Sequence, residues 1–148
     1  PAGSRPLPRV LERGQSAEVP LRIADDLPHW HSLGRVKSVR LRLRFTNLQP
    51  SADRVQVELN HALLPESILE KIDLTYRLLD VGAAASPYGY AFDYHLTPEF
   101  YPRPGRNVVK VTLLERDLKL DVPFEFYDVD CAVEYRLHRH FEKHPIEY

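Results

Sequence analysis

The feature that most restricts the fold of this chain is a repeated alternation of apolar and polar residues with a period of two. This pattern is typical of strands with one face in a core and the other in solvent, whereas amphipathic helices repeat every three to four residues. No helical segment is long enough for the crossovers of a parallel sheet. The alternating apolar sets are Val19, Leu21 and Ile23; Val39, Leu41, Leu43 and Phe45; Val55, Val57 and Leu59; Tyr88, Tyr90, Phe92 and Tyr94; Val109, Val111 and Leu113; and Val129, Cys131, Val133 and Tyr135.

These strands, spaced by roughly ten residues, predict an all-β fold, a two-sheet antiparallel sandwich of the jelly-roll kind with one short helical turn. We expect the turn in "PESILEKIDL", where Ser67 can cap a helix before Leu74, Tyr76 and Leu78 return to period two. Phe124 and Phe126 are out of step with Val129, which predicts a bulge near Tyr127 or Asp128.

Length and composition favour one folded domain. The chain has 148 residues, and no apolar run approaches the ~20 residues of a membrane span. We expect a linker over 1–14, the sandwich over 15–137 and a tail over 138–148. The start at Pro1, without a signal-like segment, indicates a piece of a longer protein, which is exported if a signal peptide lies upstream.

The charge balance argues against nucleic acid as a partner. Twenty basic and 21 acidic residues give a net charge of −1, whereas nucleic-acid binders neutralise phosphates with an excess of basic residues. The basic run Arg40, Arg42 and Arg44 lies on one strand face, which we interpret as a solvated outer face.

The segment "PRPGRNVVKV" places a sharp turn directly before a strand. Pro104 fixes φ, Gly105 allows a positive φ, and Asn107 can bond to its own backbone where the strand begins.

Two blocks, "DRVQVELNHALLP" (53–65) and "YAFDYHLTPEFYPRPGRNVVKVTL" (90–113), resemble the galactose-binding-like, jelly-roll accessory domain of bacterial glycoside hydrolase-like proteins. Gly105, Asn107, Val109 and Val111 match that family's turn-and-strand motif. One departure is Asn60-His61, which stands where the family has Asn-Gly. Since a tight type I′ turn prefers glycine there, we expect a longer loop running to Pro65.

Carboxylates are the first candidates for chemistry. The carboxylate pairs are Asp25 with Asp26 and Asp128 with Asp130. A glycosidase needs a cleft that holds two carboxylates at a set separation, and the sequence indicates no such cleft, so we expect no catalysis by this chain. Turn capping or a structural calcium ion is the alternative use of these four aspartates.

The histidines and the cysteine give weaker signals. His29 and His31, and likewise His138 and His140, have a spacing that can hold a metal, but we interpret them as exposed loop histidines. Cys131 lies inside a strand, where a buried, inert thiol is usual, and it has no disulfide partner because it is the only cysteine.

Aromatic residues in loops suit a sugar ligand, because pyranose C–H faces stack on aromatic rings. Trp30 lies between His29 and His31, and Tyr101 lies in the loop 96–105. These four residues are the candidate glycan site, with Trp30 as a lid of the sandwich as the alternative. The stripe from Tyr88 to Tyr94 is expected to belong to the core.

The expectation is therefore a non-catalytic accessory module of a larger carbohydrate-active protein, which binds glycan weakly or packs against an adjacent catalytic domain of the same polypeptide. The alternative is a structural or assembly domain without a ligand. An independent hydrolase is disfavoured, since the sequence shows neither a nucleophile motif nor an acid pair.

Overall fold

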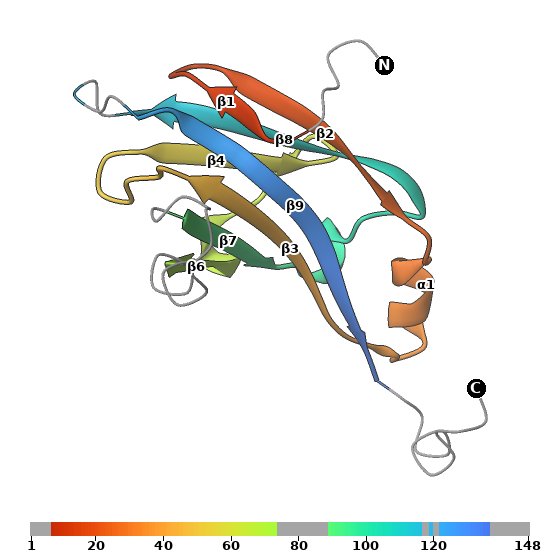
Figure 1. The fold of residues 1–148 in the computed structure, drawn as a ribbon. Helices are drawn as coiled ribbons and strands as arrows, with labels where there is room; N and C mark the ends of the chain where they lie inside the picture. The colour runs from red at the N-terminus through yellow and green to blue at the C-terminus, as the bar shows by residue number, and fades with distance from the viewer. Residues whose placement is uncertain (1–6, 74–88, 117–118, 120–121, 137–148) are drawn as a thin grey trace, which may run out of the picture.

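The computed structural model describes residues 7–73, 89–116, 119 and 122–136, and in this part of the chain it is a sandwich of two antiparallel sheets (Figure 1). This confirms the predicted fold class. The five-stranded sheet has the order β1 (Arg9–Leu11), β9 (Phe124–Tyr135), β3 (Val36–Thr46), β7 (Gly89–His95), β6 (Leu69–Asp73), and the four-stranded sheet has the order β2 (Ser16–Ile23), β8 (Gly105–Glu115), β4 (Arg54–Leu59), β5 (Ala62–Leu63).

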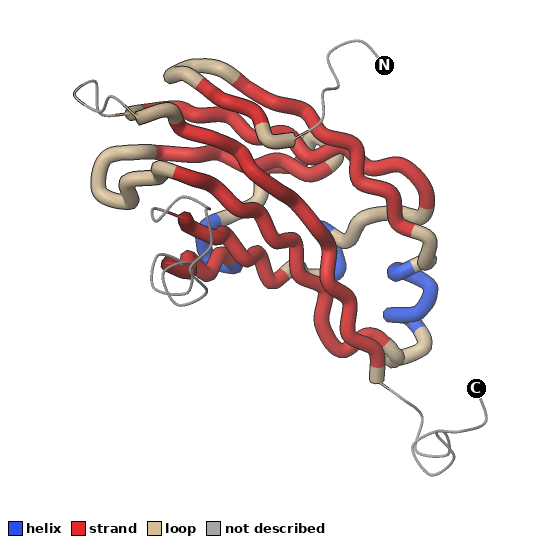
Figure 2. The backbone as a smooth tube through the Cα atoms, in the orientation of Figure 1, coloured by secondary structure: helices blue, strands red, loops and turns tan. Residues whose placement is uncertain are grey.

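Helix is scarce in the described residues. The chain forms one short helix, α1 (Leu27–Ser32), and two single 3₁₀ turns, η1 (Glu66–Ile68) and η2 (Pro98–Phe100), which Figure 2 shows beside the long strands. No helix in the described residues has the length and apolar character needed to cross a membrane.

The core is built from the inward faces of the alternating strands, as predicted. It includes a cluster of aromatic rings, in which Phe45 of β3 packs against Phe92 of β7 and against Phe124 and Phe126 of β9. Burying these alternating apolar side chains is the main free-energy gain that holds the sheets together. The core residues predicted from sequence all belong to this cluster, Val133 at its partly buried margin: Val39, Leu41, Leu43, Val57, Val109, Val111 and Val133.

The aromatic stripe and the bulge were also predicted correctly. Phe92 and Tyr94 are buried, and Tyr90 packs against the core, whereas Tyr88 lies outside the described residues. The register of β3 against β9 jumps from Arg44 opposite Asp128 to Phe45 opposite Phe126, so Tyr127 is the extra, bulged residue.

The first sheet begins earlier than the expected boundary at residue 15. Arg9–Leu11 pairs with the start of β9, and Leu11 is buried in the core. The lead over 1–14 therefore contributes an edge strand.

The helical turn followed by a strand, predicted after Pro65, is confirmed, and the turn is a single 3₁₀ turn with a different cap residue. Pro65, not Ser67, precedes the single 3₁₀ turn, and no side chain caps it. The strand begins at Leu69, immediately after this turn, while Leu74, Tyr76 and Leu78 lie outside the described residues.

The two turns singled out from sequence have different outcomes. Gly105 has φ +94°, so the glycine-dependent turn before β8 is confirmed. The longer loop expected after Asn60 was wrong. Asn60 and His61 both have positive φ, and Leu59 pairs with Ala62, which makes a two-residue hairpin of the type I′ kind without glycine.

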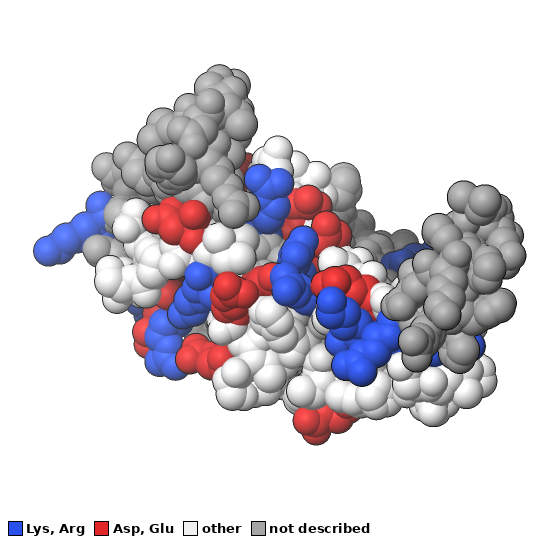
Figure 3. All heavy atoms as spheres, turned by 90° about the horizontal axis from the view of Figure 1, so that it is seen from below, with Lys and Arg blue, Asp and Glu red and all other residues white. Residues whose placement is uncertain are grey.

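The outer face of the five-stranded sheet carries charges of both signs. Arg42 lies opposite Asp130 on β9 and opposite Asp93 on β7, and Arg44 lies opposite Asp128. Figure 3 shows basic and acidic side chains interleaved on this side of the molecule. The predicted outer face of arginines is therefore present, and acidic side chains on the neighbouring strands balance it.

Candidate functional site

The helix α1 carries three of the four predicted glycan-site residues at one end of the sandwich, where the chain passes from β2 to β3 (Figure 1). Asp26 caps it, because its carboxylate accepts a hydrogen bond from the backbone N–H of His29 at 3.2 Å. Leu27 is fully buried and anchors the first turn in the core. Gly34, with φ +71°, ends the helix.

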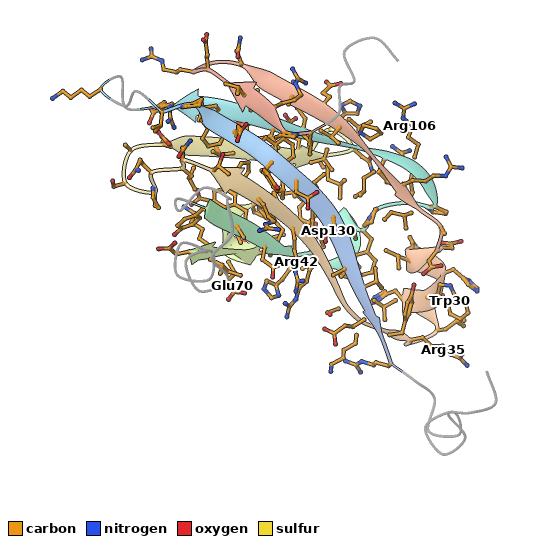
Figure 4. All side chains as sticks on the ribbon, viewed as in Figure 1. Trp30, Arg35, Arg42, Glu70, Arg106 and Asp130 are labelled. Carbon is orange, nitrogen blue, oxygen red and sulfur yellow. The ribbon has the colours of Figure 1, made fainter. Side chains whose placement is uncertain are left out.

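Trp30 is partly buried and packs against the hydrophobic core. The guanidinium carbon of Arg35 lies 5.9 Å from the centre of the indole ring of Trp30. The ring of His29 contacts the indole ring edge-on, with the two ring centres 5.8 Å apart. The backbone N–H of Arg35 donates to the carbonyl of Trp30 at 3.0 Å, which holds Arg35 close to the ring. Trp30 therefore serves as a lid for this end of the core and also remains in contact with polar side chains at the surface (Figure 4).

Tyr101 approaches the same helix from a distant part of the chain. It follows the turn η2, and its ring lies 5.5 Å from the ring of His31, with the planes at 89°. Edge-to-face contacts of this kind are a preferred aromatic geometry. Partial burial raises the pKa of the Tyr101 hydroxyl, a group that can both donate and accept hydrogen bonds.

A further polar contact lies at this end, between the segment before α1 and the last strand. The hydroxyl of Tyr135 donates a hydrogen bond to the carboxylate of Asp25. Burial, and then the bond to Asp25, raise the pKa of Tyr135 to about 12. Next to it, the N–H of Arg136 donates to the carbonyl of Arg35 at 2.7 Å, which ties the end of β9 to the segment after α1.

The structure places the four predicted residues in two separate contacts that share α1: His29 with Trp30, and His31 with Tyr101. It adds Arg35, Asp25 and Tyr135, which the sequence analysis did not assign to this site. Arg35 could have been assigned to this end from sequence, because it follows Trp30 closely, just after Gly34. The contact of Tyr135 could not have been predicted, because 110 residues separate it from Asp25.

The four calcium candidates are not gathered into one group. Asp25 and Asp26 bond to Tyr135 and to the helix N-terminus, Asp128 accepts from the N–H of Val129 at 2.9 Å, and Asp130 lies opposite Arg42. Among the described residues, the side chains close enough to share a metal ion include none of these four.

Other candidates have separate positions. His138, His140 and His144 lie outside the described residues. Cys131 is partly buried on β9, and burial, together with the charge of Asp130, raises the pKa of its thiol to about 11. The thiol is therefore protonated at neutral pH, in keeping with the inert role predicted for it.

A second cluster was missed from sequence. Glu70 of β6 and Asp93 of β7 are paired residues on neighbouring strands, and His95 lies two residues farther along β7. Their possible metal-binding atoms all lie within 4.8 Å of one another. The available signal was Asp93 and His95 at a spacing of two on one strand, a pattern that places both side chains on one face.

No protein-family model, no curated protein and no solved structure matches this chain.

Proposed function

We propose that this chain is a non-catalytic accessory module that binds glycan weakly at the α1 end of the sandwich. The observation that supports this is that α1 takes part in two aromatic contacts, Trp30 with His29 within the helix and His31 with Tyr101 from a distant loop. We also propose that the chain is related to the galactose-binding-like accessory domains of glycoside hydrolase-like proteins. Its parent protein would then act on carbohydrate.

The chemistry of this end suits a sugar. A pyranose has apolar C–H faces for the rings of Trp30 and Tyr101, and its hydroxyls require both donors and acceptors. Arg35 offers donors, Asp25 offers an acceptor, and the exposed imidazoles of His29 and His31 offer either. Arg35 lies 5.9 Å from the centre of the Trp30 ring, and Asp25 directly precedes Asp26, the cap of α1.

The same geometry predicts a low affinity. The contact between Arg35 and Trp30 is worth about 0.5–1 kcal/mol at an exposed site, and a sugar on that ring face must displace or share it. Stacking of a sugar on one aromatic ring contributes on the order of 1 kcal/mol of binding free energy. We therefore expect dissociation constants in the high micromolar to millimolar range, with useful retention only when several modules act together.

Affinity electrophoresis in gels that contain polysaccharide tests the proposal. Trp30→Ala and Tyr101→Ala should remove the retardation of the wild-type chain. Tyr127→Ala is the matched control, because Tyr127 is an exposed aromatic that contacts Arg44 at the opposite end of β9 from Tyr135. Unchanged retardation of both site variants, with melting curves that show them folded, would rule the site out.

The alternative is that this end docks onto a neighbouring domain of the parent protein. The observation in its favour is Leu33, which is 53% exposed directly after α1 and gives the end an apolar rim that a sugar does not need. A chain that is retarded by no polysaccharide, but whose Leu33→Asp variant no longer associates with the neighbouring domain, would support docking instead.

A further inference from the structure

We propose that Glu70, Asp93 and His95 bind a divalent transition-metal cation of the Zn²⁺ type on the outer face of the five-stranded sheet. This site lies on β6 and β7, and Figure 4 shows Glu70 far from Trp30 at the α1 end. It is independent of the glycan proposal.

The sheet itself brings the three side chains together. Glu70 and Asp93 are paired residues of neighbouring antiparallel strands, and His95 projects from the same face as Asp93. The Nε2 of His95 lies 3.0 Å from Oε1 of Glu70. Zinc binds imidazole nitrogen and carboxylate oxygen at about 2.0–2.2 Å, so the three ligand atoms need only small rotations of exposed side chains to reach one ion. Glu70 and His95 are exposed and can make these adjustments.

The buried carboxylate of Asp93 is the observation that points to an ion. Asp93 is only 2% exposed. Its Oδ2 accepts from Arg40 at 3.3 Å and lies 3.5 Å from Arg42, but its buried Oδ1 has no hydrogen-bond partner within the described part of the chain. A buried carboxylate oxygen without a partner is costly, and an ion or a water molecule is the usual explanation. The possible ligand atoms of Glu70 and His95 lie within 4.8 Å of a carboxylate oxygen of Asp93, which favours an ion.

The two arginines act on the other oxygen. Because both contact Oδ2, they fix the orientation of the carboxylate and leave Oδ1 for a ligand, as outer-shell partners do in metal sites. Their positive charges also lower the affinity for any cation. We therefore expect binding in the micromolar range, not the tighter binding of structural zinc sites.

The ligand set determines the class of metal. One imidazole and two carboxylates suit Zn²⁺ and its neighbours in the first transition series, with water completing the coordination. Calcium is disfavoured, since it takes six to eight oxygen ligands.

Isothermal titration of the full chain with Zn²⁺ tests this site, in a background where His138, His140 and His144 are glutamine so that the tail histidines do not contribute. We expect one Zn²⁺ per chain and a rise in melting temperature with Zn²⁺. Glu70→Gln and His95→Gln remove exposed ligands without disturbing the core, and each should weaken binding by about tenfold or more, since even supporting residues are worth 10- to 100-fold.

His61→Gln is the matched control, because His61 is an exposed histidine in the turn after β4, and its affinity for Zn²⁺ should equal that of the background. Equal affinities of the His95→Gln variant and the background would overturn the proposal. So would the absence of any saturable heat or melting shift, or saturable binding of Ca²⁺ in place of Zn²⁺.

Discussion

Asn60 and Asn107 are joined through their side chains, although 47 residues separate them, because the amide of Asn60 donates to the Oδ1 of Asn107 at 2.7 Å. The Oδ1 of Asn60 in turn accepts from the N–H of Val108 at 2.9 Å. The turn after β4 is thus fastened to the start of β8. Asn107 also bonds with the backbone of Arg103 as both donor and acceptor, which closes the turn before β8.

Replacing Asn107 by alanine should destabilise the domain by roughly 2–4 kcal/mol, because the side chain is fully buried and its hydrogen bonds to Asn60 and to the backbone of Leu21 and Arg103 would be lost. Urea unfolding followed by fluorescence measures the change. Asn60→Ala should cost less, since Asn60 is partly exposed and water can replace its bonds. Equal losses for the two variants would contradict this explanation.

Replacing Gly105 by valine should destabilise the domain by roughly 1–3 kcal/mol, owing to the positive φ at this position. A Cβ built on Gly105 would meet nothing within 4 Å, so the cost is backbone strain and not a clash. Thermal melting should show the loss for Gly105→Val and little change for Arg106→Val at the neighbouring exposed strand position. An unchanged midpoint for Gly105→Val would mean that the turn does not depend on glycine.

Replacing His61 by glycine should stabilise the domain by roughly 0.5–1 kcal/mol. The type I′ turn holds His61 at φ +71°, and the strain relieved should exceed the greater chain entropy that glycine brings to the unfolded state. Ala62→Gly, at the next residue in a strand, should destabilise instead. The pair of melting temperatures checks the sign, and a lower value for His61→Gly would refute the turn assignment.

The thiol of Cys131 should react slowly in the folded protein. Its pKa is raised from 9.0 to about 11, so folding favours the protonated form, and this contribution to stability is present below pH 9 and lost as the pH rises through about 11. A thiol reagent at pH 8 should label the unfolded chain much faster than the native one, with the native rate rising between pH 9 and 11. Equal rates for native and unfolded chains at pH 8 would contradict the raised pKa.

The strands could be predicted because each has an apolar face of period two, a signal contained in the local sequence. The helix α1 was missed, although Asp26 and Gly34 mark its ends, because its six residues bury only Leu27 fully and show no helical periodicity. The turn at His61 was missed because the side-chain bonds of Asn60 to β8 support a conformation that local preference disfavours.

The candidate sites depend more on tertiary contacts. Trp30 and Tyr101 could be selected as aromatics in loops, but the contact of Tyr101 with His31 depends on how the loop before β8 folds back on α1. The buried state of Asp93 follows from its neighbours on β3 and β6, which the sequence of β7 does not reveal.

Glycan binding at the α1 end is best examined by following the fluorescence of Trp30, the only tryptophan in the chain, during titration with oligosaccharides. We expect a saturable change in emission with a midpoint in the high micromolar to millimolar range, which Tyr101→Ala weakens and Tyr127→Ala leaves unchanged. Emission that no oligosaccharide perturbs, from a chain that melts cooperatively, would contradict glycan binding and favour docking of this end onto another domain.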